Sequence, residues 1–173
     1  DLGVDDAAIG RALAGFQGID RRLQVVGELR LQAGEVTVVD DYGHHPTEIA
    51  ATLDALRQAY VGRRIVLVFQ PHRYTRTRDL LDDFARVLSQ ADTLLVTEVY
   101  AAGESPIEGA DGRAICRAVR SRGKVEPIFV AGVDEIAASL SGIVHAGDVI
   151  AMMGAGSIRG VAHDLRRHPD ALR

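Results

Sequence analysis

The chain has 173 residues, a formal net charge of −4 and a pI near 5.8, which argue against a nucleic-acid partner because polyanion binding normally requires a basic face. A hydrophobic fraction of 47% is ordinary for a globular chain, and the length suffices for one well-buried domain. No apolar run approaches the roughly 18 residues of a membrane helix, so we expect a cytoplasmic protein without a membrane partner. The single cysteine, Cys116, cannot form an internal disulfide, and we expect a small buried side chain rather than a reactive thiol.

The first 20 residues do not suffice for a core of their own. Ala7 to Phe16 is a short amphipathic stretch, and a linker follows at Gln17–Asp20. We expect residues 1–20 to be the last helix of a preceding domain with its linker, and residues 21–173 to be the domain proper. Because the chain begins at Asp1, we also expect it to be a piece of a longer protein.

The rest of the chain alternates strand and helix patterns. Leu23 to Leu31 alternates apolar and polar residues, and Gln32–Glu35 supplies a turn, which together predict a β-hairpin. Short apolar runs indicate strands covered on both faces, at 36–40, 65–69, 93–97, 127–130 and 148–153. Helical spacing lies between them, at 49–60, 80–88, 112–122 and 133–141. This alternation predicts an α/β fold with a mostly parallel sheet, flanking helices and a preceding hairpin.

A first polar cluster, Asp40–Glu48, follows strand 36–40 and precedes a helix opened by Pro46. We interpret it as part of a ligand site, because open parallel sheets bind ligands at the carboxyl ends of their strands. His44 and His45 are expected to be neutral, since a helix N-terminus disfavours imidazolium. The plainer alternative is that one histidine caps the helix while Asp41 accepts backbone amides in the turn.

A second cluster, Gln70–Arg78, follows strand 65–69. Since this strand is the next along the chain, we expect the two clusters to lie side by side. Arg73 and Arg76 are expected in a loop before a helix, where paired guanidinium groups can bind a carboxylate or phosphate. The alternative is surface ion pairing with nearby aspartates, which suits Arg78, expected inside the helix.

Other ligand sites are disfavoured. Gly154–Gly160 follows the last strand, but its spacing departs from the dinucleotide pattern G-x-G-x-x-G, and tight packing of the turn explains the glycines. A phosphate-binding loop, G-x-x-x-x-G-K-[ST], does not occur in the sequence. A metal-dependent hydrolase is a further alternative, although adjacent histidines rarely converge on one ion. Its ligand types would suit zinc or iron, at Asp41, His44, His45 and His72.

The motifs resemble the C-terminal domain of the Mur ligases of peptidoglycan synthesis, and among them the members that add L-alanine. The residues that carry the resemblance are Gly18–Arg22, Asp40–Glu48, Phe69–Asp79, Val99–Glu104 and Gly154–Gly156. It implies a three-domain enzyme in which an N-terminal domain holds UDP-N-acetylmuramate and a central domain binds ATP with Mg²⁺. This chain would be the Rossmann-like third domain, and the phosphate loop would lie in the central domain.

The resemblance also implies roles for single residues. Asp41 and Arg22 would face the nucleotide, with Asp41 on the ribose. Arg73 and Arg76 would hold the carboxylate of L-alanine, and Tyr42 and His44 would shape the pocket around it. The lysine, glutamate and magnesium ligands of phosphoryl transfer would lie outside this chain. We therefore expect no catalytic residue here and no activity from the chain alone.

Two other functions remain open. One is a related ligase that recycles murein tripeptide onto the same sugar nucleotide, although a tripeptide needs a roomier clamp than the 69–79 motif suggests. The other is a free-standing nucleotide-binding module, in which Arg73 and Arg76 would have no purpose. One departure from the family pattern is Ser157, where the family often has asparagine.

Overall fold

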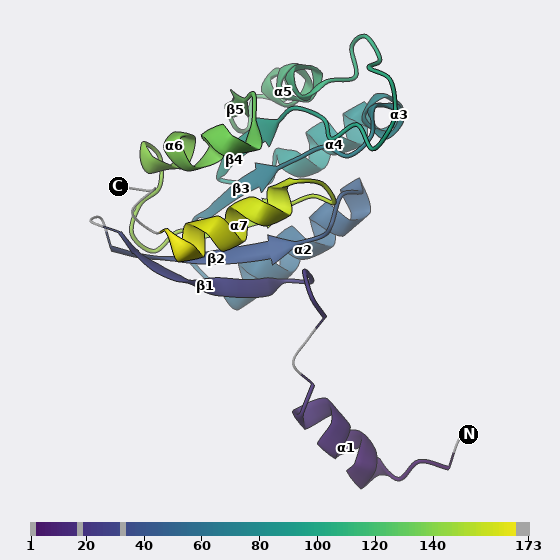
Figure 1. The fold of residues 1–173 in the computed structure, drawn as a ribbon, viewed down its shortest axis with the longest axis vertical. Coiled ribbons are helices and arrows are strands. Elements are labelled where there is room, and N and C mark those ends of the chain that lie inside the picture. Colours follow the sequence, from purple (N-terminus) through teal and green to yellow (C-terminus); the bar gives the residue numbers. More distant parts are fainter. Residues whose placement is uncertain (1–2, 17–18, 32–33, 169–173) are drawn as a thin grey trace.

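The computed structural model describes residues 3–16, 19–31 and 34–168 and shows a six-stranded sheet between two layers of helices (Figure 1). In spatial order the strands are β1 (Gln24–Leu31), β2 (Gly34–Asp41), β6 (Val149–Met153), β3 (Ile65–Phe69), β4 (Thr93–Thr97) and β5 (Pro127–Val130). β1 pairs antiparallel with β2, and the other neighbouring strands pair parallel. The predicted α/β fold and hairpin are confirmed; the predicted turn falls partly on Gln32 and Ala33, outside the described residues.

Helices cover both faces of the sheet. One face carries α2 (Pro46–Ala59), α4 (Leu81–Leu88) and α5 (Gly112–Ser121), and the other carries η1 (Val133–Glu135), α6 (Ile136–Ser141) and α7 (Ile158–Arg167). Ile65, Leu67 and Phe69 of β3 face the first layer, whereas Val66 and Val68 face the second. The strand is therefore apolar at every position, as expected when both faces are buried.

The N-terminal helix α1 (Asp6–Ala14) stands apart from the sheet and its helices (Figure 1). Asp5 caps it by accepting the amide of Ala8 at 2.7 Å, and none of its residues is buried. The helix predicted in residues 1–20 is thus confirmed, while its membership of a preceding domain stays a prediction. The linker predicted at Gln17–Asp20 falls partly on Gln17 and Gly18, which lie outside the described residues.

The arginine-bearing segment is helical, contrary to prediction. A six-residue helix, α3 (Tyr74–Asp79), precedes α4, and Leu80 forms the corner between them. Arg76 therefore lies inside a helix rather than in a loop before one, and Arg73 is its N-cap residue. The sequence of α3 contains no aliphatic residue, so apolar periodicity could not reveal it.

The order of the strands determines where polar residues can meet. β6 lies between β2 and β3, so the strands before the two polar clusters are not neighbours in the sheet. The order arises because the last strand, which is completely buried, inserts at the centre of the sheet. After β2 the chain enters α2 on one face, and after β6 it enters α7 on the other. Such a switch point opens a crevice at the carboxyl ends of the strands.

Candidate functional site

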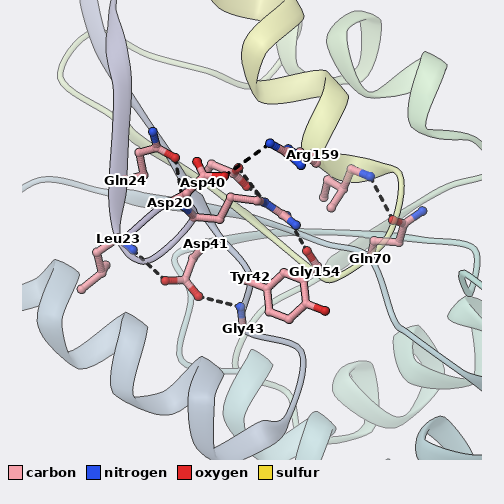
Figure 2. Close-up of polar contacts among 12 residues, drawn as sticks. Asp20, Leu23, Gln24, Asp40, Asp41, Tyr42, Gly43, Gln70, Gly154 and Arg159 are labelled. Carbon is pink, nitrogen blue, oxygen red and sulfur yellow. Dashed lines mark hydrogen bonds and ion pairs between the residues drawn. The ribbon is translucent and has the colours of Figure 1, made fainter. Parts of the chain in front are cut away.

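A buried ion pair forms the base of the site at the switch point (Figure 2). Arg21 Nε donates to Asp40 Oδ2 at 2.9 Å, and Arg21 Nη2 donates to the carbonyl of Gly154 at 2.6 Å. Asp40 is 0% exposed and Arg21 only 6%. Our site prediction did not include Arg21. The available signal was Asp40 itself, a carboxylate at the end of a buried strand that must find a partner.

The neighbouring Asp41 accepts hydrogen bonds from the backbone. Its carboxylate accepts the amides of Leu23 at 2.8 Å and of Gly43 at 2.7 Å, and so ties the start of β1 to the turn after β2 (Figure 2). Acceptance of a turn amide is the plainer alternative considered for this residue. Each oxygen retains a second lone pair, so these bonds leave acceptor capacity.

A hollow of about 300 Å³ lies beside Asp41. Its other walls are Arg22, Leu23, Glu48, Ala51 and Thr52. The Arg22 side chain is 47% exposed and pairs with Glu48 at 3.4 Å. The two residues predicted to face a nucleotide thus line one hollow.

The two histidines after β2 have different positions. His45 is the N-cap of α2 and its Nδ1 accepts the amide of Thr47 at 3.3 Å, so one histidine does cap the helix. His44 Nδ1 lies 3.0 Å from the carbonyl oxygen of Tyr42. Since a carbonyl can only accept, this contact places a proton on His44 Nδ1.

Glu48 completes a capping box at this helix end. Its Oε2 accepts the amides of His44 at 2.9 Å and His45 at 3.1 Å. Burial alone would raise the pKa of Glu48, but these two amides, with the nearby charges of His44 and Arg22, bring the pKa below its usual value. The carboxylate is therefore ionised at neutral pH.

His72 comes from the segment after β3 and meets the first cluster. Its ring lies 5.3 Å from that of His44, edge to face, and stacks on Tyr100 at 5.6 Å. Burial lowers the pKa of His72, and the positive charges of His44, Arg76 and Arg73 lower it further. The ring is therefore neutral at pH 7. The two polar clusters do lie together as predicted, although they reach across β6.

The glycine turn after β6 packs closely against Gln70 and Tyr100. A Cβ at Gly154 would lie 2.8 Å from the carbonyl oxygen of Gln70, and one at Gly156 would lie 2.6 Å from the Tyr100 ring. Gln70 in turn donates to Ser157 Oγ at 3.0 Å and accepts the amide of Ile158 at 3.0 Å. Tight packing thus explains the glycines, as the sequence suggested.

Arg73 and Arg76 project from the start of α3. Arg73 has a φ of 73° and a ψ of 136°, a backbone conformation that costs L-residues about 1–3 kcal/mol. Its side chain is 49% exposed and lies 3.6 Å from Glu104. Arg76 Nη1 donates to the carbonyl of His72 at 3.0 Å, which orients the guanidinium group along the pocket wall.

A pocket of about 640 Å³ separates the two clusters. Its lining residues come from both, namely His44, His45, His72, Arg73, Thr75, Arg76, Asp79 and Leu80. Tyr42 does not line it; its ring lies 5.2 Å from that of His44 and 5.2 Å from the guanidinium of Arg21. Arg78 pairs with Asp79 at 2.7 Å on the surface, as the ion-pair alternative required for it.

Metal ligation and thiol chemistry find no support in the described part of the chain. Across residues 3–16, 19–31 and 34–168, no three His, Cys, Asp or Glu side chains gather so that they could hold a metal ion. Cys116 is buried in the core, and burial raises the pKa of its thiol to about 11. In the same described ranges, no helix is long and apolar enough to cross a membrane.

Comparison with known proteins decides the family. Residues 21–156 match the family model described as Mur ligase, glutamate ligase domain, which is most of the chain. This chain belongs to the Mur ligase family.

Individual relatives show which Mur ligases this chain resembles. A UDP-N-acetylmuramate–L-alanine ligase from Burkholderia thailandensis is 59% identical over 95% of this chain and 36% of its own length. The crystal structure of a UDP-N-acetylmuramate-alanine ligase from Thermotoga maritima matches with a TM-score of 0.79 and 30% identity, over 99% of this chain and 35% of that one. A murein peptide ligase from Psychrobacter arcticus matches with a TM-score of 0.69 and 25% identity, over 98% and 33%. The present Mur ligase chain thus spans about a third of the length of these relatives.

Proposed function

We propose that this chain is the C-terminal domain of an ATP-dependent ligase that joins L-alanine to UDP-N-acetylmuramate in peptidoglycan synthesis. The observation that carries the proposal is the pocket between the two strand-end clusters, which is lined by Arg73, Arg76 and His44. A 59% identical relative bears the name of that activity. Among the solved structures, the UDP-N-acetylmuramate-alanine ligase matches at 30% identity and a TM-score of 0.79, and the murein peptide ligase at 25% and 0.69.

The two arginines would hold the carboxylate of L-alanine. Guanidinium groups bind carboxylates through charge-assisted hydrogen bonds, each worth about 1.5–3 kcal/mol. Because His72 is neutral at pH 7, the positive charge of this wall resides on the arginines. His44, whose Nδ1 proton points to the Tyr42 carbonyl, would shape the pocket beside the amino group, and in its neutral form it would present Nε2 as an acceptor.

In the proposed reaction the muramoyl carboxylate takes the γ-phosphoryl group of ATP, and ADP leaves. The amine of L-alanine then attacks the acyl carbon, and inorganic phosphate leaves as the amide forms. The chain would contribute binding and orientation to this sequence. Fixing the alanine carboxylate leaves the amine as the only nucleophile free to move toward the acyl phosphate.

The hollow beside Asp41 would take the ribose side of ATP. It offers a carboxylate with spare lone pairs and the half-exposed Arg22, which suit ribose hydroxyls and a phosphate respectively. The phosphate loop, the magnesium ligands and the UDP-N-acetylmuramate site would belong to N-terminal and central domains of the same longer chain. Residues 1–20 would be the end of the central domain, which accords with the exposed apolar side chains of Ile9 and Leu13 on α1.

Two alternatives are tested by the same experiment. A murein-tripeptide ligase would consume ATP with the tripeptide rather than with L-alanine. A nucleotide-binding module would use only the hollow beside Asp41, and the separate pocket with Arg73 and Arg76 argues against it.

The test is ATP consumption by the full-length protein, with UDP-N-acetylmuramate and either L-alanine or the tripeptide. Arg73→Ala or Arg76→Ala should raise the KM for L-alanine about ten- to a hundredfold, with little change for ATP. Asp41→Asn should act mainly on ATP. Arg78→Ala removes a neighbouring arginine outside the pocket and serves as the control. Normal alanine dependence in both pocket variants, with lost ATP affinity, would refute the assignment.

A further inference from the structure

The segment between β4 and α5, residues 98–111, contacts the arginine-bearing helix α3 from outside the pocket. Glu98 anchors its base, because Glu98 Oε1 accepts the amide of Gly112, the first residue of α5, at 3.2 Å. Further along, Ala102 and Gly103 have φ values of 50° and 86° and form a turn closed by a hydrogen bond from the Glu104 amide to the Ala101 carbonyl. This turn presents Glu104 to α3.

Helix α3 lacks a cap of its own. Its N-cap residue, Arg73, makes no side-chain capping bond. Glu104 replaces the missing cap, since its Oε2 accepts the amide of Thr75 at 3.0 Å and its Oε1 accepts the Thr75 hydroxyl at 2.7 Å. A short helix with one buried residue, Thr77, depends on such bonds because packing contributes little to it.

The same segment holds the unusual backbone of Arg73. The carbonyl of Tyr100 accepts the Arg73 amide at 2.9 Å, and the Tyr100 amide donates to Pro71 at 2.8 Å. Glu104 Oε1 lies 3.6 Å from Nη1 of Arg73. Thus the positive φ of Arg73 lies between two contacts to one segment, at Tyr100 before the helix and at Glu104 within its first turn.

We propose that Glu104 is a positioning residue. By capping α3 it fixes the orientation of Arg73 and Arg76 and so strengthens binding of the substrate carboxylate. The inference rests on the proposed function of that pocket. Glu104 itself does not line the pocket, so it would act on the substrate through α3 and through its ion pair with Arg73. The hydrogen bonds from Thr75 lower the pKa of Glu104, which keeps it ionised at neutral pH.

Three variants of the full-length protein test this. Glu104→Ala removes the cap and should raise the KM for L-alanine about five- to thirtyfold, the loss expected for a helix cap, while kcat and the KM for ATP change less than threefold. Glu104→Gln can accept the Thr75 amide and donate to the Thr75 hydroxyl, so its KM for L-alanine should stay within about threefold of wild type. Glu108→Ala removes an exposed carboxylate from the same segment and should leave all constants unchanged.

Hydrogen exchange of the segment around Thr75 supplies a readout that needs no turnover. In Glu104→Ala the Thr75 amide should exchange faster, whereas in Glu104→Gln it should not. Unchanged alanine KM in Glu104→Ala, equal rises for alanine and ATP, or a Glu104→Gln variant as impaired as Glu104→Ala would each overturn the proposal. If the wild-type protein shows no alanine-dependent turnover, the proposed function fails instead, and the exchange data still report whether Glu104 caps α3.

Discussion

Replacing Arg21 by methionine should strongly destabilise this chain. The substitution keeps an unbranched apolar stem but removes the guanidinium group that satisfies Asp40 and the carbonyl of Gly154. Because Asp40 is 0% exposed, its carboxylate would remain buried without a counter-charge. Breaking one side of a buried ion pair typically costs about 3–5 kcal/mol, which is a third or more of the stability of many domains.

The adjacent arginine is a matched control. Arg22 is 47% exposed and its ion pair with Glu48 spans 3.4 Å, so Arg22→Met should cost no more than about 1 kcal/mol. The double variant Arg21→Met with Asp40→Leu removes both buried charges and should recover most of the loss. Recovery would be incomplete because the Gly154 carbonyl still lacks its donor.

Urea denaturation of the chain, followed by far-ultraviolet circular dichroism, measures these differences through the free energy of unfolding. The slope against urea must stay the same for the comparison to hold. An Arg21→Met variant that loses no more than Arg22→Met would refute the reasoning. It would mean that water reaches Asp40 and that the pair does not hold the start of the domain to the sheet.

Two further predictions concern stability. The pKa of His72 in the folded chain lies below its usual value of 6.5, so the unfolded chain binds more protons, and stability should fall as the pH drops from about 6.5 toward the folded pKa. In denaturant titrations, His72→Asn should lose less free energy of unfolding between pH 7.5 and 5.5 than the wild type. Equal losses in the two proteins would contradict this. Gly112→Ala should cost about 1–3 kcal/mol because its Cβ would collide with the Thr97 carbonyl and the Phe129 ring, whereas Gly160→Ala in α7 meets open space and should gain up to about 1 kcal/mol. Equal effects of the two alanines on the urea midpoint would rule out the steric explanation.

The strands were predictable because each is a short apolar run with helices on both sides. Ile65–Phe69 is apolar and buried at every position, as expected for a parallel strand covered on both faces. The helix after β2 was equally clear, since Pro46 suits its first turn and Ile49, Leu53 and Leu56 follow at helical spacing. These features depend on neighbours along the chain, which a sequence pattern records.

Features that depend on distant residues were missed. The first turn of helix α3 is capped by Glu104, which lies 29 positions after Thr75 in the chain. The residues of α3 themselves show no apolar periodicity. The role of Arg21 depends on Asp40 and Gly154, which come from two different strand ends. The adjacent Arg22, for which the family resemblance implied a role, is exposed, and no local pattern distinguishes the two arginines.

The position of β6 connects these observations. β6 lies between β2 and β3, and the chain that leaves it packs closely against Gln70 and Tyr100. Gly154 and Gly156 permit this packing because a Cβ at either position would collide there, and Gly154 also offers the carbonyl that binds Arg21. The glycines thus serve the pocket and the buried pair at once. A methyl group at Gly156 would press on Tyr100, which stacks on His72 and binds the Arg73 amide, so a turn that touches no substrate should still disturb the arginine pair.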